Sequence, residues 1–190
     1  MTEEQRYTVL QKHGDVELRE YAAHTLASVT VSGSVEQAAN AAFRPLFNYI
    51  SGQNHGSESP TLDSATVQRS VGEQLSMTAP VIQEAAGTSH WTVSFVLPGT
   101  RAFEEYPVPN DPQVRLRAMP VQAAAALRWS GRWTPSNIAK WTQELQQQID
   151  DAGWDVAGEA RWTRFDPPWM PPFARRNEIV IPVSVAERNT

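Results

Sequence analysis

The spacing of apolar side chains predicts an amphipathic helix in the first half of the chain. After Ser34, apolar residues recur every three or four positions as far as Ile50, which is the period of one helix face. Ser34 and Gln37 have the spacing of a capping box at the start of a helix. Pro45 lies inside this segment and predicts a bend, because proline removes a backbone hydrogen bond.

A second helix with a narrower apolar stripe is predicted in the other half. The stripe ends at Ile149, and its start is marked by Thr134 and Pro135, a cap followed by proline at the first helical position. Gly153 is the predicted stop, since glycine readily adopts the conformation that ends a helix. Each half of the chain therefore contributes one amphipathic helix.

Apolar and β-branched runs predict strands on both sides of each helix. The segments Val16–Gly33 and Val114–Gly131 precede the helices, and Trp91–Pro98 and Asn177–Val183 follow them. Helices interrupt the strands too rarely for a doubly wound parallel sheet. The pattern therefore predicts an α+β fold with a mainly antiparallel, barrel-like sheet.

The two strand regions that precede the helices are similar to each other. Residues 16–33 read VELREYAAHTLASVTVSG and residues 114–131 read VRLRAMPVQAAAALRWSG, so both begin with V-x-L-R and end with S-G. We interpret this as an internal duplication, about residues 14–98 and 112–186, within a single domain of residues 1–190. The alternative is a coincidence between segments of strand-like composition.

Two polar segments are predicted to be loops. Residues 51–76 contain few apolar anchors, so part of this segment can pair as a strand while the remainder is expected to be mobile. Residues 98–112 contain several proline and glycine turn signals and are predicted to join the two halves.

The composition narrows the classes of function. The chain has 190 residues, no cysteine and a net charge of -5 at pH 7. Nucleic acid is an unfavourable partner, because its binding depends on Lys and Arg at the phosphates. Disulfides, thiolate nucleophiles and thiolate ligands are excluded. With no signal peptide and no apolar run of about 20 residues, we expect a cytoplasmic protein without a membrane partner, whose oligomeric state stays open.

Candidate metal ligands and catalytic motifs are few. His24 lies in the first strand region and is a candidate axial ligand for a haem iron; the alternative is a histidine satisfied by a backbone group. None of the four histidines has another His, Asp or Glu at the spacing of a zinc or two-metal site. Phosphate-binding loops, nucleophile elbows and H-E-x-x-H are also missing from the sequence. We therefore predict no catalytic residue.

Aromatic residues and prolines near the end of the chain predict a pocket wall. Residues 161–178 read RWTRFDPPWMPPFARRNE. The prolines hold Trp169, Met170 and Phe173 in a stiff, extended course, and a stiff apolar loop beside an apolar helix face can form a pocket. The alternative is that these rings cap one end of the sheet as ordinary core.

Several segments together resemble the SOUL haem-binding protein family. They are VELREYAAHTLASVTVSG, FNYISGQN, MTAPV, the helix beginning at Thr134 and FDPPWMPPFARRNEIVI, and they follow the family's order through nearly the whole chain. The resemblance implies a distorted, mainly antiparallel β-barrel flanked by two α-helices, with two pseudo-symmetric halves. It also implies a distant relation to GyrI-like effector-binding domains, which hold small molecules between their halves.

The resemblance further implies a tetrapyrrole site between the first helix and the late proline-rich loop. The residues that would form it are Asn40, Phe43, Arg44, Phe47 and Asn48 on the helix, with Met77, Trp169, Met170, Phe173 and Arg176 on other segments. Met77 is interpreted as a packing residue at the cavity floor, because a thioether is a weak iron ligand unless a histidine is fixed opposite.

The chain departs from the family at several of these positions. Asn40, Asn48 and Met170 stand where haem-binding relatives carry basic residues, and Glu20 stands where other relatives carry a histidine. Arg44 is the only cation on the first helix that could meet a haem propionate. The resemblance therefore predicts haem more strongly than these residues do.

Two functions of different classes follow. The expected one is non-enzymatic binding, carriage or sequestration of haem or another planar tetrapyrrole, whose flat faces bury well against Phe43, Phe47 and Trp169. The alternative is a GyrI-like small-molecule-binding domain or hydrolase, in which a carboxylate inside the sheet such as Glu178 acts as a base. Against the alternative, Glu178 can instead pair with a neighbouring arginine such as Arg176.

Overall fold

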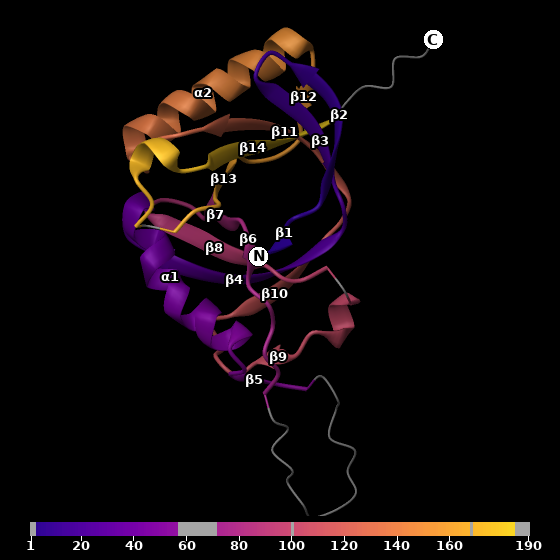
Figure 1. Cartoon of the computed structure of the whole chain (residues 1–190), viewed down its shortest axis with the longest axis vertical. Coiled ribbons are helices and arrows are strands. Elements are labelled where there is room, and N and C mark those ends of the chain that lie inside the picture. Colours follow the sequence, from indigo (N-terminus) through magenta and orange to yellow (C-terminus); the bar gives the residue numbers. More distant parts are fainter. Residues whose placement is uncertain (1–2, 57–71, 100, 168, 185–190) are drawn as a thin grey trace, which may run out of the picture.

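The structure is a computed structural model that describes residues 3–56, 72–99, 101–167 and 169–184. Figure 1 shows two α-helices on the outside of a large, curved sheet. The two helices and the strand regions predicted around them are confirmed. Within the described ranges, no helix combines the length and apolarity that crossing a bilayer requires.

The main elements follow the same order in the two halves. Those of the first half are β3 (Val16–Tyr21), β4 (His24–Ser32), α1 (Val35–Ile50), β7 (Val81–Ala85) and β8 (His90–Val96). Those of the second half are β10 (Arg115–Met119), β11 (Gln122–Trp129), α2 (Pro135–Ala152), β13 (Arg161–Arg164) and β14 (Asn177–Ser184). The smaller elements are β1 (Glu3–Glu4), β2 (Tyr7–His13), β5 (Asn54–His55), β6 (Thr78–Ala79), η1 (Phe103–Glu105), β9 (Val108–Pro109), β12 (Asp155–Val156) and η2 (Pro172–Ala174).

The two predicted loops contain short elements. In the segment 51–76, β5 pairs with β9 of the segment 98–112, so the two loops are held together. Residues 57–71, to which the expectation of mobility mainly applied, lie outside the described residues.

One large sheet of mainly antiparallel strands organises the molecule. Its order is β10-β4-β8-β7-β13-β14-β11-β3-β2, and β12 pairs with β14 beside this path. Every pairing in it is antiparallel, whereas the separate pair β1·β6 is parallel. The predicted α+β class, with a mainly antiparallel sheet flanked by two helices, is confirmed.

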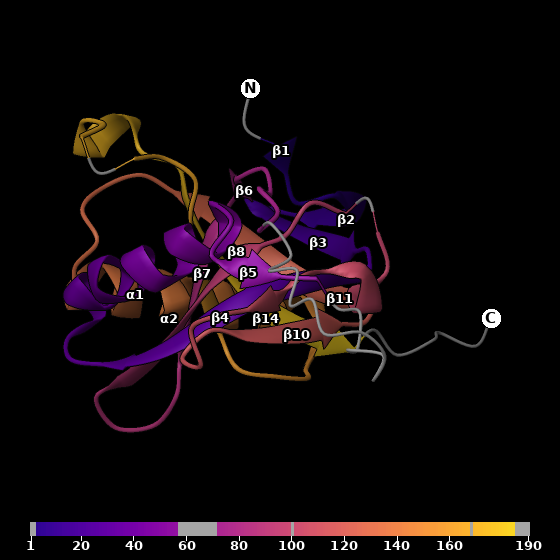
Figure 2. The ribbon, with the colours of Figure 1, turned by 90° about the horizontal axis from the view of Figure 1, so that it is seen from below.

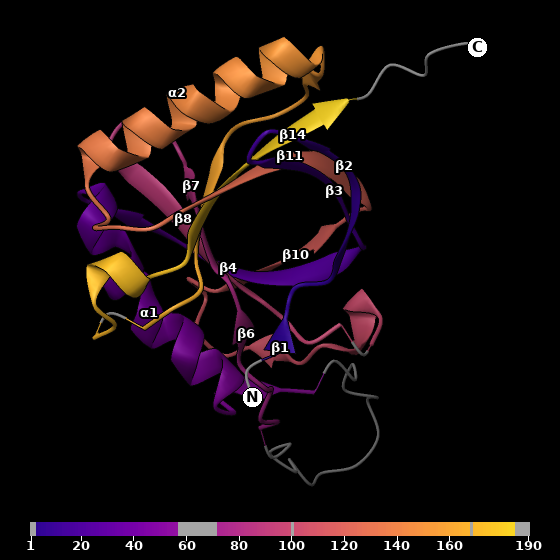
Figure 3. The same cartoon turned by 45° about the horizontal axis from the view of Figure 1, so that its top comes forward.

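The predicted closure of the sheet into a barrel is wrong. The path ends at β10 and β2, and no pairing between described residues joins these two strands. Both carry charged side chains, Arg115 and Arg117 on β10 and Lys12 on β2, and most of β2 is exposed. Charged, exposed edge strands have little to gain from further pairing. The result is a strongly curved open sheet (Figure 3).

The strand order is symmetric about its centre, where β7 pairs with β13. On one side the order is β7, β8, β4, β10, and on the other it is β13, β14, β11, β3. Strands at corresponding places in the sequence thus occupy corresponding places in the sheet. The exception is the pair of strands with the V-x-L-R motif, β3 and β10, each of which lies on the side of the other half. A duplication would produce this arrangement, although the duplication itself stays a prediction.

The ends of the helices agree only in part with the capping signals. Thr134 caps α2, because its hydroxyl accepts a hydrogen bond from the Asn137 backbone N–H at 3.3 Å, and Gly153 ends the helix with a φ of 69°. Ser34 stands at the start of α1, but its side chain makes no capping hydrogen bond, so the predicted capping box is wrong. Pro45 lies within α1, which continues to Ile50.

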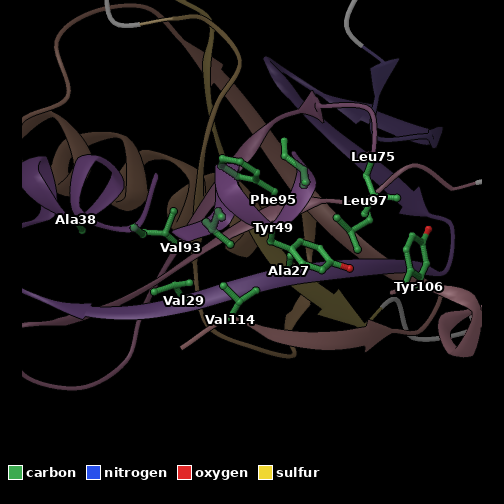
Figure 4. Packing of buried hydrophobic residues seen from close by; sticks show 13 residues of the cluster. Ala27, Val29, Ala38, Tyr49, Leu75, Val93, Phe95, Leu97, Tyr106 and Val114 are labelled. Atoms are coloured by element: carbon green, nitrogen blue, oxygen red, sulfur yellow. The ribbon is translucent and has the colours of Figure 1, made fainter. Parts of the chain in front are cut away.

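Each helix forms a core mainly with strands of its own half, and the segment with the V-x-L-R motif of the other half joins that core. Figure 4 shows the core beneath α1, where Tyr49 of the helix lies among Ala27 and Val29 of β4 and Phe95 of β8. The core beneath α2 is formed with β11, β14 and β3. Because side chains alternate along a strand, the other face of the sheet carries a different set, which points to the concave interior between the halves.

Candidate ligand-binding site

Two aromatic side chains of α1 lie beside the core that the helix forms with the sheet, and solvent reaches both of them. Phe43 and Phe47 are one turn apart, and their side chains are 43% and 45% exposed. Their rings stack with centroids 5.6 Å apart, and Phe43 also meets the buried Phe95 edge-on at 5.8 Å. The pair is therefore anchored to the core on one side and open to solvent on the other.

The late proline-rich loop exposes two more aromatic side chains. Trp169 is 82% exposed and Phe173 is 80% exposed, so these two rings do not belong to the core, whereas Trp162 of the same run packs against the core beneath α2. The loop projects from the side of the molecule that carries α1 (Figures 1 and 3), but Figure 2 shows its tip standing away from the helix. Among the described residues, no ring contact joins the loop to Phe43 or Phe47.

Hydrogen bonds fix the base of this loop. The Arg175 side chain donates from Nε to the Met170 carbonyl at 2.7 Å, and the Arg176 backbone N–H donates to Asp166 Oδ2 at 2.6 Å. The guanidinium of Arg176 lies 3.7 Å from the centre of the Phe165 ring. These contacts hold the base of the loop, and the exposed rings lie beyond it at the tip.

The polar residues expected at the site lie in different surroundings. Asn40 and Arg44 are exposed on α1, and Asn48 is half-buried. Arg44 forms no ion pair among the described residues, so its charge is open to a ligand. Arg176 is already engaged, since its side chain donates to Glu4 at 2.9 Å and to Glu178 at 3.1 Å.

The two methionines expected at the site lie on separate segments. Met77 is 41% exposed and directly precedes β6, whereas Met170 is half-buried in the proline-rich loop. The structure therefore gives neither residue a position at a buried cavity floor, and their contact with a ligand stays a prediction.

His24 lies on the face of β4 that points away from α1. In β4, Ala27 and Val29 join the core beneath α1, and His24 has the opposite orientation along the strand. Its Nδ1 lies 2.8 Å from the Ala22 carbonyl and its Nε2 lies 3.0 Å from the Gln5 amide nitrogen. Burial lowers the pKa of His24. The alternative of a histidine satisfied by a backbone group therefore describes this residue, and no cluster of three possible metal ligands occurs among the described residues.

Glu178 is the centre of an arginine cluster in the concave interior. It is 1% exposed, and Arg19 donates from Nη1 to its Oε2 at 2.6 Å. Arg176 and Arg128 donate from Nε to its Oε1 at 3.1 Å and 3.4 Å. The predicted pairing with Arg176 is confirmed, and the carboxylate that was considered as a base is occupied by three guanidinium groups.

A second ion pair also joins the halves, but here the arginine belongs to the second half and the carboxylate to the first. Arg117 of the second half donates from Nη2 to Glu84 of the first half at 2.6 Å, and from Nε to Ser28 at 3.2 Å. Arg19 and Arg117 are the arginines of the two V-x-L-R motifs. In the sequence this motif served only as a sign of repetition, and both pairs were missed, although an arginine at the same place in two similar strand segments was a usable signal.

The cavity between the halves is small. It has a volume of about 20 Å³ beside Arg19, Tyr21 and Glu178, whereas ligand pockets of drug-sized molecules measure roughly 300–1,000 Å³. A neighbouring cavity of about 140 Å³ lies beside His24. Neither could enclose a tetrapyrrole, but a wider hollow of about 640 Å³ lies next to them along β2 and is lined by residues such as Tyr7, Glu20 and Val121.

Comparisons with known proteins place these features in a family. The model of the family described as SOUL heme-binding protein matches residues 2–182. In a comparison with curated protein sequences, nothing matches the chain.

Solved structures share the fold. The crystal structure of the EcmrR C-terminal domain has a TM-score of 0.61 and 13% identity, over 94% of this chain and 98% of that one. The crystal structure of a hydrolase from Listeria innocua has a TM-score of 0.58 and 11% identity, over 92% of this chain and 94% of that one. At these identities the likeness shows the fold alone.

Proposed function

The chain belongs to the SOUL heme-binding protein family, and on that premise we propose that it binds haem or another planar tetrapyrrole at the aromatic surface of α1, flanked by the late proline-rich loop. The observation that carries the proposal is the exposed, stacked pair Phe43 and Phe47. The function is binding, carriage or sequestration and involves no catalytic residue.

The exposure of these rings supports a flat, apolar ligand. Large aromatic side chains stabilise a protein mainly when they are buried, and exposed apolar patches commonly mark interaction sites. Phe43, Phe47, Trp169 and Phe173 are all exposed on the side of the molecule that carries α1. A planar macrocycle would cover ring faces that water now meets, and Trp169 and Phe173 would close over its second face when the loop tip moves toward the helix.

Charge at the same surface supports an acidic ligand. Arg44 directly follows Phe43 and is exposed on α1. A guanidinium binds a carboxylate such as a haem propionate with two parallel hydrogen bonds. The exposed Asn40 lies one helical turn before Arg44, so its amide can donate to the same group.

The surface fits a macrocycle held without an iron ligand from the protein. His24, the candidate ligand, lies on the face of β4 turned away from α1. When bound, haem would supply an iron capable of redox chemistry, but the residues at this surface only bind and orient the ring. The proposal therefore extends to tetrapyrroles without iron.

The alternative of a hydrolase based on Glu178 receives no support from its surroundings. A general base needs a free lone pair within reach of a substrate proton, whereas the Glu178 oxygens accept from three arginines beside a cavity of about 20 Å³. Two other expectations remain part of the proposal. The protein acts in the cytoplasm, and its net charge of -5 disfavours nucleic acid as a partner.

A haemin titration followed at the Soret band tests the proposal. We expect a saturable one-to-one spectral shift for the wild type and at least about a tenfold weaker affinity for Phe47→Arg, since losing the ring face and adding a charge costs about 1.4 kcal/mol or more. His24→Ala should bind like the wild type.

Phe103→Arg is the matched control for this experiment. Phe103 is also an exposed phenylalanine, 37% exposed, but it lies on η1 and not on α1. Equal weakening in Phe47→Arg and Phe103→Arg, or no saturable shift in the wild type, would refute the proposed site.

A further inference from the structure

The concave interior contains a buried arginine whose charge no described carboxylate neutralises. Arg161 of β13 is 7% exposed. No described Asp or Glu oxygen lies within 4.0 Å of its guanidinium nitrogens. Its register neighbour on β7 is Glu84, but that carboxylate pairs with Arg117 instead. A positive charge is thus left over inside the sheet.

The hydrogen bonds of Arg161 are incomplete. Its Nη2 donates to Gln122 Oε1 at 2.8 Å, whereas its Nε is buried and has no acceptor among the described residues. Buried polar groups of folded proteins nearly always have a partner. Burial lowers the pKa of Arg161, which agrees with a charge that lacks local compensation.

Tyr21 presents a second donor at the same place. Its hydroxyl oxygen accepts from Arg19 Nη1 at 3.2 Å, and no described acceptor receives the hydroxyl proton. Tyr21 and Arg161 line the same cavity. The carboxylate that also lines it, Glu178, already accepts from three arginines. Donors and positive charge therefore predominate in the cavity, although Gln5 and Tyr7 also line it.

The cavity has room for one small particle. Its volume is about 20 Å³, so it can hold a particle at least as large as a water molecule. Chloride is only slightly larger than water, whereas phosphate and carboxylates are much bulkier. The apolar part of the cavity wall is formed by Pro80, Ile82, Phe165 and Val180.

We propose that this cavity binds a single monatomic anion of the size of chloride, held by the guanidinium of Arg161 and the hydroxyl of Tyr21. Arg161 belongs to the second half and Tyr21 to the first, so the anion links the halves. The stability of the protein then depends on the identity of the anion in solution and not only on ionic strength.

Crystals grown or soaked in bromide provide the direct test. Bromide replaces chloride and scatters anomalously, so an anomalous peak in the cavity, within hydrogen-bonding reach of Arg161 Nε, is expected. The absence of such a peak, with a water molecule in its place, would overturn the proposal. Because this readout uses the wild type, it does not depend on whether any variant folds.

Thermal unfolding supplies the solution test. As sodium chloride replaces sodium gluconate at constant ionic strength, the wild-type melting temperature should rise by about 2–4 °C. Arg161→Met should lose this anion-dependent rise. If the rise persists in Arg161→Met, or if the wild type shows none, the cavity does not bind the anion in solution.

Arg164→Met is the matched control. Arg164 is on the same strand, and its Nε is also buried without an acceptor among the described residues. It lies on the other face, however, with its guanidinium 4.0 Å from the Trp133 ring centre, and it is not part of the cavity wall. Arg164→Met should therefore keep the rise with chloride, and its loss there would assign the effect to strand stability and overturn the site.

Discussion

Two ion pairs join the halves of the sheet with the same closest distance but different burial. Arg19 reaches Glu178 and Arg117 reaches Glu84, each with a closest nitrogen–oxygen distance of 2.6 Å. The side chains of the first pair are 3% and 1% exposed, and those of the second are 39% and 19% exposed. The two pairs therefore contribute differently to stability although their distances are equal. The reason is that the loss of hydration on burial is the main cost of an internal charge.

The buried pair depends on the network around it. Burial by itself would lower the pKa of Arg19, but the hydrogen bond to Glu178 and the interaction with Tyr21 more than offset it and raise that pKa above its ordinary value. Glu178 in turn accepts from two more arginines. Arg117, in contrast, keeps contact with solvent. The comparison teaches that removing one partner has a large effect only where water cannot replace it.

The largest expected effect on stability follows from removing the carboxylate of the buried pair. Glu178→Ala removes the buried acceptor of Arg19 and leaves its charge with Glu17 alone, a partner that is 24% exposed, so we expect the free energy of unfolding to fall by about 3–5 kcal/mol. Urea denaturation followed by circular dichroism measures this change. A loss below about 1 kcal/mol would show that the interior is wetter than its burial indicates.

The double variant Arg19→Met with Glu178→Leu is the control for this prediction. It removes both charges and fills the space with apolar side chains, so it should regain much of the stability that Glu178→Ala loses. A double variant as unstable as Glu178→Ala would point to lost packing and not to an unpaired charge.

A smaller effect is expected from the exposed pair. Glu84→Ala leaves Arg117 partly in water and still bonded to Ser28, so the free energy of unfolding should fall by about 1 kcal/mol or less. The same urea measurement applies. If Glu84→Ala proves as damaging as Glu178→Ala, burial does not distinguish the two pairs.

The smallest expected effect is that of salt concentration on the coupling free energies of the two ion pairs. Raising sodium gluconate from about 0.05 to 0.5 M shortens the Debye length from about 14 to 4 Å, so the coupling of Arg117 to Glu84 should weaken by a few tenths of a kcal/mol. The coupling of Arg19 to Glu178 should stay constant, because buried pairs are screened much less. Double-mutant cycles at the two salt concentrations measure both couplings, and a larger change for the buried pair would contradict this account.

Local sequence signals predicted most helices and strands, whereas they did not predict the interactions between strands that are distant in the sequence. The cap of α2 at Thr134 and its end at Gly153 depend on a few neighbouring residues, so the sequence was sufficient. Ser34 had the same kind of signal, yet its hydroxyl makes no capping bond. The open edges of the sheet depend on which strands meet at the end of a long path, and no local pattern contains that information.

The candidate site shows the same division. The family resemblance, and not the apolar spacing, pointed to Phe43 and Phe47 as site residues; the structure exposes both rings on α1, and their contact with a ligand stays a prediction. The pairing of Glu178 with Arg176 could be predicted because the two are only two residues apart in the sequence. Arg19 lies 159 residues before Glu178 along the chain, so their contact depends on the complete sheet.

The position of β14 in the middle of the second half also determines how the protein can form during synthesis. β14 is the last described strand to be made, and it pairs with β11, β12 and β13. The strands of the first half around α1 are complete by residue 96, so they can assemble while the ribosome is still working. The contact of Glu4 with Arg176 spans 172 residues and is among the last to close. The amino terminus therefore leaves the ribosome first and reaches its final place near the end.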